Sequence, residues 1–184
     1  MLVLLEKEMA RTYEQRFKRL LKSSWVYSPA RYQVKMLQPK FNEMIRAEAG
    51  AFIGVVPAVV GGKIESMASP LGYCVCVTCG TLHPWKCDKK SGEGKLDSGH
   101  FLSSDRIALE ESNCHPQCVY CNRDKSGSGS HYRLYMETVY GQDEIDRLYR
   151  IAGDRLYPAP LREWLIEKRI EFEDRIKAAV EKMT

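Results

Sequence analysis

The chain has 184 residues, of which 44% are hydrophobic and 28% are charged, as in ordinary globular proteins. This length predicts one domain with room for appended helices. The longest apolar stretch, residues 51–60, is too short to span a bilayer, and charged residues at positions 6–8 leave no secretory segment. We therefore expect a soluble cytoplasmic protein with no membrane partner.

The net charge of +4 is spread unevenly. Residues 1–48 hold ten Lys and Arg against five Asp and Glu, whereas the rest of the chain is close to balance. Two interpretations remain open. Either the basic N-terminal arm contacts phosphates, or its cations form an ordinary solvated helix face.

The first 72 residues are expected to form a basic helical arm and a connector. Apolar residues recur at steps of three and four from Leu2 to Leu20, which predicts a helix. Ser28 and Pro29 are typical of a second helix start, Pro39 should break or kink the helix at that point, and Gly50 is a candidate stop. Residues 51–72 favour a short strand or a loop connection.

The last segment, residues 141–184, is expected to be helical. One short helix should run from residue 143 to near Gly153, and Pro158 should open a long amphipathic helix. Its apolar stripe consists of Leu161, Leu165, Phe172, Ile176 and Val180. The partner of this stripe is either the N-terminal helix or a second copy of the chain, as in a homodimer.

Residues 73–140 contain two Cys-x-x-Cys pairs, Cys76 with Cys79 and Cys118 with Cys121. In a reducing compartment such pairs indicate a zinc site more often than disulfides, and a set of seven cysteines would leave one thiol over. Each pair presents two sulfurs to one ion, and Gly80 suits the left-handed backbone of such a turn. The other cysteines, Cys74, Cys87 and Cys114, are expected to be structural thiols.

Between and after these pairs lie residue types that suit phosphodiester hydrolysis. The reaction needs a base to activate water and a divalent cation to polarise the phosphate. His100, in the sequence Asp97-Ser-Gly-His100, is the candidate base, and Asn122, directly after Cys121, is the candidate ligand of Mg²⁺ or Mn²⁺. The zinc site would then fix the position of Asn122.

At these positions the sequence resembles the HNH, or ββα-metal, nucleases, in which a strand His, a loop Asn and a helix His or Asn occur in that order. The resemblance implies His100 as general base, Asn113 as the residue that fixes the loop and Asn122 as metal ligand. It also implies an α+β fold, with a small zinc-stapled ββα module over residues 73–140 flanked by N- and C-terminal helices.

Several separated motifs narrow the resemblance to the phage-lambda NinG (Rap) recombination nucleases. They lie within residues 73–150 and are Cys76-Val-Thr-Cys79-Gly-Thr, Asp97-Ser-Gly-His100-Phe, Asn113-Cys-His-Pro-Gln-Cys118-Val-Tyr-Cys121-Asn-Arg-Asp-Lys125 and Tyr140-Gly-Gln-Asp143. This family resemblance implies a phage-encoded endonuclease, acting in the bacterial cytoplasm on branched DNA such as Holliday junctions and D-loops.

The sequence departs from many HNH sites at Gly99, where an Asp or His often supplies a second metal ligand. Asp97 points to the same side of an extended strand as residue 99, so it would ligate the metal directly or through water. Lys125, Arg123, Arg133 and the Lys89–Lys90 loop are candidate DNA contacts, with surface solvation as the alternative for each. Tyr132 would either stack on a base or, as we favour, pack in the core.

These observations together predict a metal-dependent DNA endonuclease with structural Zn²⁺ and catalytic Mg²⁺ or Mn²⁺. Two alternatives stay open. One is a sequence-specific or nonspecific HNH nuclease, and the other is a noncatalytic zinc-binding DNA module.

Overall fold

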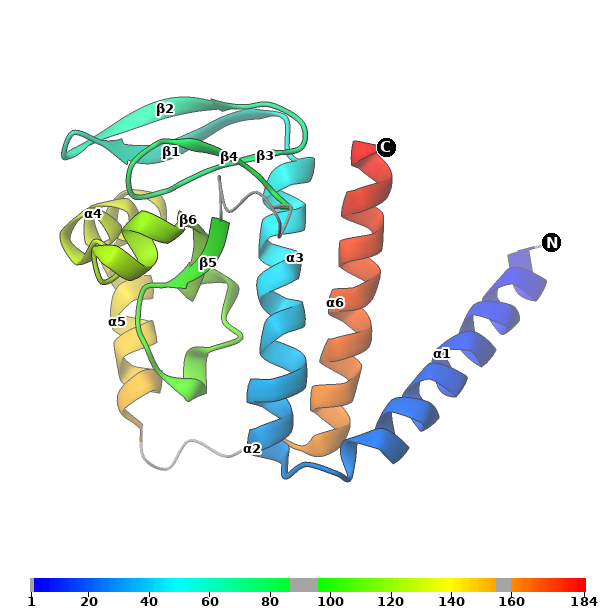
Figure 1. The fold of residues 1–184 in the computed structure, drawn as a ribbon. Coiled ribbons are helices and arrows are strands. Elements are labelled where there is room, and N and C mark those ends of the chain that lie inside the picture. Colours follow the sequence, from blue (N-terminus) through cyan, green and yellow to red (C-terminus); the bar gives the residue numbers. More distant parts are fainter. Residues whose placement is uncertain (1, 87–95, 155–159) are drawn as a thin grey trace.

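The computed structural model describes residues 2–86, 96–154 and 160–184, and describes residues 2–9 through their backbone only. The described chain combines helices with three two-stranded antiparallel sheets, which confirms the mixed α and β character expected from the sequence. Figure 1 shows α3 and α6 side by side, the sheets at one end and beside them, and α1 projecting away from the body.

The N-terminal helices largely match the sequence pattern. α1 runs over Leu2–Ser24, and the side chain of Ser28 caps α2 (Pro29–Tyr32) by accepting a hydrogen bond from the Arg31 amide. A π-helical turn, η1 (Gln33–Leu37), then leads directly into α3 (Gln38–Ala51). Pro39 therefore does not end the helix, because it stands in the first turn of α3, where a missing N–H costs no hydrogen bond.

Gly50 is not the helix stop that the sequence suggested. It lies inside α3 and is buried, and a Cβ at this position would come 2.6 Å from Cβ of Trp85. The glycine is thus required for the close approach of Trp85, and α3 ends one residue later.

Residues 54–69 form a β-hairpin, so the region expected as a short strand or connection holds two strands. β1 (Gly54–Val60) pairs with β2 (Lys63–Ser69) in antiparallel register. Gly61 and Gly62 make the turn with φ of 57° and 82°, the backbone conformation that a two-residue hairpin turn needs. The hairpin is attached to the first cysteine pair through the Val59 amide, which donates to Val77 O at 2.9 Å.

Two further strand pairs carry the cysteine and histidine motifs. β3 (Tyr73–Val75) pairs with β4 (Leu82–Pro84), and β5 (Leu96–His100) pairs with β6 (Cys114–Cys118). The short helical turns η2 (Asp105–Ile107) and η3 (Glu111–Asn113) lie between β5 and β6, and the π-helical turn η4 (Tyr120–Asp124) comes after β6. The Lys89–Lys90 loop and Cys87 lie outside the described residues.

The remaining helices are α4 (Gly129–Val139), α5 (Gly141–Gly153) and α6 (Arg162–Met183). The short helix expected near residues 143–153 is confirmed, whereas Pro158 lies outside the described residues. Leu161 precedes α6 and is 73% exposed, so it does not belong to the apolar stripe. Leu165 and Phe172 of the stripe pack against α3 and α1 residues in the same molecule.

Two hydrophobic cores hold these elements. The first lies among α1, α3 and α6 and includes Phe41, Leu165, Ile170 and Phe172, and Cys114 of β6 also reaches it. The second joins the β1–β2 hairpin, α4 and α5 around Val59, Tyr132, Met136, Ile145 and Leu148. Strands β5 and β6 lie between the two cores, as Figure 1 shows.

No helix in the described part of the chain combines the length and the apolar content needed to cross a membrane.

Candidate functional site

The four motif cysteines converge on one point. The sulfurs of Cys76, Cys79, Cys118 and Cys121 all lie within 4.8 Å of one another, and the Cys79 and Cys118 sulfurs are 3.9 Å apart. Tetrahedral zinc with Zn–S bonds of about 2.3 Å requires sulfurs separated by about 3.8 Å. The cluster could therefore hold a metal such as zinc, as the sequence predicted.

The backbone around the cysteines has the form of two metal-binding turns. Gly80 takes the left-handed conformation expected of it, with φ of 75°, and its amide donates to Cys76 O at 2.8 Å. The amides of Cys118 and Cys121 donate to the sulfurs of Cys76 and Cys118 at 3.3 and 3.4 Å. A hydrogen bond between the paired thiols raises the pKa of Cys76 and lowers the pKa of Cys79 to about 4, so one sulfur of the cluster is readily a thiolate.

The cysteines outside the cluster are packed as apolar side chains. Cys74 and Cys114 are buried, and burial raises the pKa of each thiol to about 12. The Cys74 thiol donates to Arg46 O at 3.2 Å, which ties β3 to α3. Neither thiol belongs to the group of four sulfurs that lie within 4.8 Å of one another.

His100 stands at the end of β5 and is partly buried. Its Nε2 lies 3.1 Å from Ala108 O, so Nε2 carries the proton of the neutral ring and Nδ1 keeps a free lone pair. Burial lowers the pKa of His100 below its usual value of 6.5, and the bond to Ala108 O opposes this only in part. The ring is consequently neutral at pH 7 and can accept a proton at Nδ1.

Asn113 is fully buried and joins both ends of the turn segment that links β5 to β6. Its Oδ1 accepts from the Leu102 amide at 2.9 Å, while Nδ2 donates to Leu102 O and to Ile107 O, each at 3.1 Å. In addition, the Phe101 amide donates to Asn113 O at 2.8 Å. These bonds fix the chain directly after His100.

The structure brings Asp97, Asn122 and Arg123 into direct contact. Nδ2 of Asn122 donates to Asp97 Oδ2 at 3.0 Å, and Arg123 binds both Asp97 oxygens at 2.8 and 2.9 Å. This contact orients the Asn122 amide and leaves its Oδ1 turned away from Asp97. His100 lies three residues further along the same strand, and strand alternation places its side chain on the other face from Asp97.

The glycine before His100 is explained by Gln117 of β6. A Cβ at Gly99 would come within 2.1 Å of Gln117 Oε1, so a side chain at residue 99 would require Gln117 to shift. Gln117 is fully buried, and its Nε2 donates to Thr78 Oγ1 at 3.0 Å and to Gly127 O at 2.8 Å. Its Oε1 has no hydrogen-bond partner among the described residues and rests against the Gly99 backbone.

A second buried group, around His115, holds the backbone of the same glycine. The Tyr132 hydroxyl donates to Gly99 O at 2.7 Å, so His115 Nδ1 must donate to Tyr132 at 3.0 Å. The Tyr140 hydroxyl then donates to His115 Nε2 at 2.8 Å. Burial lowers the pKa of His115 to about 3, which keeps this ring neutral. Tyr132 is 1% exposed and therefore belongs to the core, as we expected.

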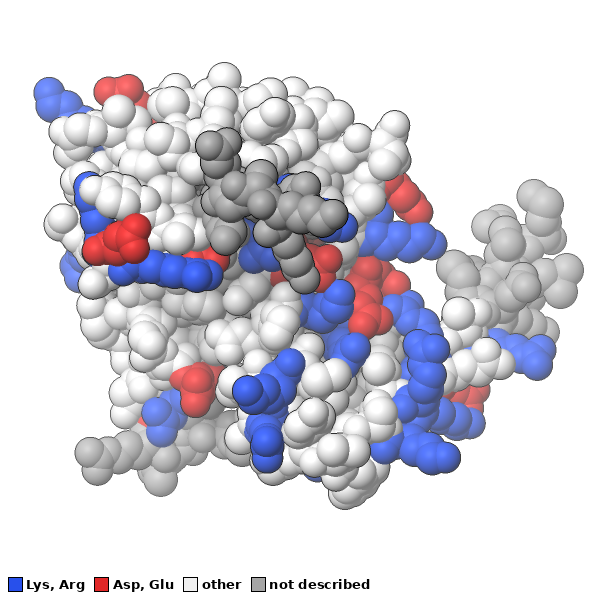
Figure 2. Space-filling model, in the orientation of Figure 1, with Lys and Arg blue, Asp and Glu red and all other residues white. Residues whose placement is uncertain are grey.

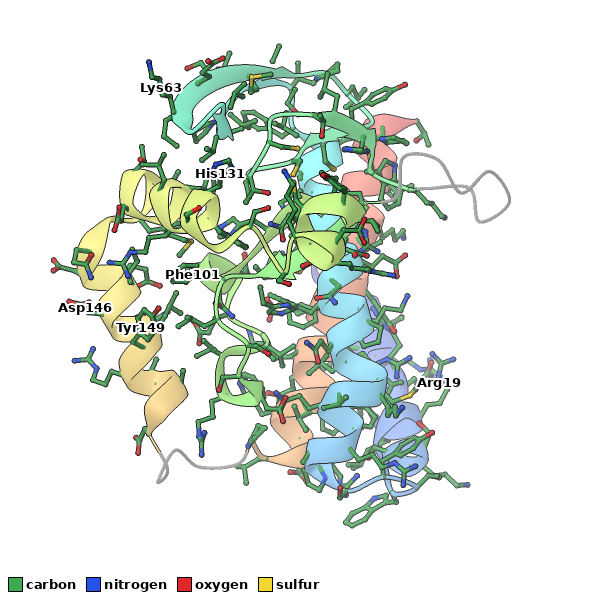
Figure 3. The ribbon with its side chains drawn as sticks, turned by 60° about the vertical axis from the view of Figure 1, so that its left-hand side comes forward. Arg19, Lys63, Phe101, His131, Asp146 and Tyr149 are labelled. Atoms are coloured by element: carbon green, nitrogen blue, oxygen red, sulfur yellow. The ribbon has the colours of Figure 1, made fainter. Side chains whose placement is uncertain are left out.

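No pattern in the sequence indicates these supporting roles. Gln117, His115 and Tyr132 act through contacts between β6, α4 and β5, and such contacts have no fixed spacing along a chain. Figure 3 shows the neighbouring Phe101 pointing toward α5, where the ring of Tyr149 lies 6.2 Å from it.

The candidate DNA contacts lie in different surroundings. Lys125 is exposed, with Nζ 4.9 Å from the Tyr120 ring centroid, and borders a depression beside the cysteine cluster. Figure 3 places His131 at the start of α4 on the rim of this depression, near the hairpin whose tip carries Lys63. Arg133, by contrast, is held by Glu137 at 2.6 Å and by Gln142 at 2.9 Å.

Comparison with known proteins identifies the family. A family model described as "NinG: Bacteriophage Lambda NinG protein" matches residues 72–183, and the chain therefore belongs to the NinG family. The match extends beyond the residues 73–150 that carry the resemblance in sequence motifs and includes α6.

Curated relatives cover a shorter stretch. The chain is 32% identical over 76 residues to "Protein ninG" of Escherichia phage 933W and of Escherichia phage lambda, which is 40% of this chain and 33% of each relative. It is 30% identical over 76 residues to "Protein ninG" of Salmonella phage P22, again 40% of this chain and 33% of the relative. The matched stretch thus spans about a third of the length of these relatives. No solved structure matches the chain.

Proposed function

We propose that this protein is a metal-dependent DNA endonuclease that hydrolyses phosphodiester bonds, selectively in branched recombination intermediates. The observation that carries the proposal is the order and placement of His100, Asn113 and Asn122. They stand at the end of β5, in the turn before β6 and on the helical turn after it, and this order along the chain resembles that of the ββα-metal nucleases. Branched DNA is the substrate that the resemblance of the sequence motifs to the NinG recombination nucleases implies.

In the proposed reaction Nδ1 of His100 takes a proton from a water molecule. The water oxygen bonds to phosphorus while the bond from phosphorus to the 3′ oxygen breaks, and the 3′ oxygen takes a proton from solvent water, which leaves a 5′-phosphate and a 3′-hydroxyl. The lowered pKa of His100 supports this role, because the ring is free to accept a proton at neutral pH. A divalent cation, when bound, neutralises charge on the scissile phosphate and on the leaving oxygen.

Asn122 would hold Mg²⁺ or Mn²⁺ through Oδ1, since its Nδ2 is committed to Asp97. Amide and carboxylate oxygens are the ligands that these ions prefer. Asp97 is engaged by Arg123, so it would join the metal only by exchanging the guanidinium for the cation. The cysteine cluster would carry structural zinc and fix Cys121, the residue before Asn122.

The test is cleavage of a labelled four-way junction and of a linear duplex of the same sequence, with Mg²⁺ or Mn²⁺ titrated. Wild type should cut the junction preferentially. Asn122→Ala should lose cleavage at every metal concentration, and Asp97→Asn should retain cleavage at raised metal. A control is His83→Ala, which changes a histidine that bonds Thr81 beside the cysteine cluster and makes no hydrogen bond to His100, Asn113 or Asn122. Equal cleavage by Asn122→Ala and wild type would remove Asn122 from the proposal.

The nearest alternative functions make different predictions for the same assay. A sequence-specific nuclease of the same class would give discrete fragments from linear plasmid DNA. A noncatalytic zinc-binding DNA module would bind the junction but would cut nothing with either ion.

A further inference from the structure

The bend between α1 and α2 carries an exposed tryptophan, and several cations lie on the same stretch of chain. We call this surface the elbow and define it by Lys22, Trp25, Tyr27, Arg31, Lys35 and Arg162. Trp25 is 69% exposed although it is a large aromatic side chain. Figure 1 shows the elbow where α1 turns into α2, close to the start of α6 and at the end of the molecule away from the β1–β2 hairpin.

Contacts with α6 hold the aromatic rings of the elbow in place. The guanidinium of Arg162 lies 4.4 Å from the centroid of the Trp25 ring. The same guanidinium donates to Ser24 O at 2.5 Å and to Tyr27 O at 3.0 Å, so it also anchors the chain between the two helices. Arg31 lies 5.6 Å from the centroid of the Tyr27 ring. The Trp25 ring is thus held in place by the Arg162 guanidinium while it remains exposed to solvent.

The charge of this region is strongly one-sided. Residues 10–35 contain seven Lys and Arg and a single acid, Glu14. Arg16 pairs with Glu173 and Asp174, and Lys18 pairs with Glu14. No ion pair among the described residues includes the elbow cations Lys22, Arg31 or Lys35.

Arg133, Arg147, Arg169 and Arg175, which lie on α4, α5 and α6, are by contrast ion-paired, whereas Arg150 of α5 forms no ion pair among the described residues. Glu163, in the first turn of α6, is the acid next to Arg162. Figure 2 shows Lys and Arg gathered over the lower part of the molecule, where α2 and the end of α1 lie in Figure 1.

We propose that the elbow is a second DNA-binding surface, which contacts the phosphate backbone through Lys22, Arg31 and Lys35 and stacks an unpaired base on Trp25. Cations together with an exposed aromatic ring are the chemistry that binds DNA where bases are unstacked. The inference rests on the proposed function and adds to it, because a branched substrate offers unpaired bases at the branch point. Residues 22–35 of the elbow lie outside the family match, whereas Arg162 lies within it.

The test measures binding apart from cleavage. A labelled four-way junction is titrated without added Mg²⁺ or Mn²⁺, at several salt concentrations, against wild type, Trp25→Ala and the triple variant Lys22→Gln, Arg31→Gln, Lys35→Gln. The matched control, Lys63→Gln, Arg150→Gln, Lys177→Gln, removes three exposed cations elsewhere. Zinc content and melting temperature show that each variant is folded.

The triple variant should lose at least about tenfold in affinity, and its slope of log K against log salt should fall by about 2–3, since each phosphate contact contributes about 0.9. Trp25→Ala should weaken binding by about tenfold with the slope unchanged, as expected for loss of one stacked base. The control should behave as wild type. In wild type, junction DNA should protect tryptophan fluorescence from iodide quenching, and Trp25→Phe should abolish the protected signal.

Several results would contradict the proposal that the elbow binds DNA. One is binding by both elbow variants with the affinity and salt slope of wild type. Another is a wild-type dimer that Trp25→Ala converts to a monomer, which would make the elbow a contact between two copies. These outcomes leave the nuclease proposal intact, because cleavage by wild type and its loss in Asn122→Ala are measured separately. A wild type that binds no DNA would overturn both.

Discussion

The helical layer of α1, α3 and α6 and the strand module of β5 and β6 are held together by different interactions. The helical layer buries apolar side chains such as Phe41, Ile170 and Phe172 and keeps its ion pairs near the surface. The strand module buries polar side chains, Asn113, His115 and Gln117, and ties each by directed hydrogen bonds. Apolar packing tolerates small shifts, whereas directed bonds fix atoms to within a fraction of an ångström.

This difference indicates where chemistry can be placed. A catalytic group must be held to within about 0.5 Å of its working position, which neighbours with locked geometry provide. His100 is surrounded by such neighbours, since Asn113 fixes the chain after it and Tyr132 and Gln117 hold Gly99 before it. The helical layer offers surface charge and an exposed ring, which suit binding better than catalysis.

The largest effect is expected from breaking the cysteine cluster. Cys118→Ser should abolish zinc binding and unfold the strand module, because metal-binding free energy is folding free energy at such a site and is on the order of the whole stability. The control is Cys114→Ser, the same atom change at a buried cysteine outside the cluster, which should keep one zinc per chain. Elemental analysis and thermal unfolding measure both. Equal zinc content in the two variants would contradict the assignment.

The next largest effect is the pH dependence that arises from His115. Its pKa is about 3 in the folded protein against 6.5 as the ordinary value, so the unfolded chain binds more protons between these limits. The stability is fully present above pH 6.5 and is lost as pH falls toward 3, by about 3–5 kcal/mol in all. The measurement is the free energy of unfolding against pH for wild type and His115→Gln. His83→Gln is the control and should keep the wild-type slope, whereas an unchanged slope in His115→Gln would count against a neutral buried ring.

A smaller effect is expected where β5 meets β6. Gly99→Ala should cost about 1–3 kcal/mol, because the new methyl group collides with Gln117 Oε1 at 2.1 Å. The double variant Gly99→Ala, Gln117→Ala should cost less than the sum of the two single variants, since removal of the amide opens the space. Chemical denaturation of the three variants gives the coupling energy. If the cost of the double variant equals the sum of the two single costs, the side chain of Gln117 does not restrict residue 99.

The smallest effect is expected at the ion-pair link between the two regions. Arg175 on α6 binds Glu48 of α3 at 2.6 Å and Glu111 of the η3 turn at 2.5 Å. These groups are partly exposed and screened by solvent, so Arg175→Gln should cost only about 1 kcal/mol. Lys18→Gln, at a fully exposed pair, is the control and should leave the free energy of unfolding unchanged. A loss of several kcal/mol at Arg175 would show that the helical layer and the strand module are more tightly coupled than their packing suggests.

The cysteine cluster and the helix start at Ser28 could be predicted because their geometry is local. Two sulfurs separated by two residues face one ion whatever surrounds them, and a serine caps the helix that begins after it. The glycines were harder to interpret. Gly80 has the left-handed backbone expected of it, whereas Gly50 serves the close approach of Trp85, which lies 35 positions away along the chain.

The surroundings of the candidate site could not be predicted either, because they depend on contacts between elements and not on local spacing. That Gln117 fills the space beside Gly99, and that Arg123 engages Asp97, depend on how β5, β6 and η4 pack. Leu161 fitted the apolar stripe of the last helix by spacing, yet it lies before α6 and is exposed, because spacing does not determine where a helix begins.

The central claim is that His100 performs the base chemistry of a DNA nuclease. It is tested most directly by single-turnover cleavage of a four-way junction in Mg²⁺ by wild type and by His100→Ala, each with and without added imidazole. The account predicts that His100→Ala cuts about 10²–10⁴ times more slowly than wild type, keeps its zinc, and regains part of its rate when imidazole replaces the missing base. Cleavage by His100→Ala at the wild-type rate would contradict it.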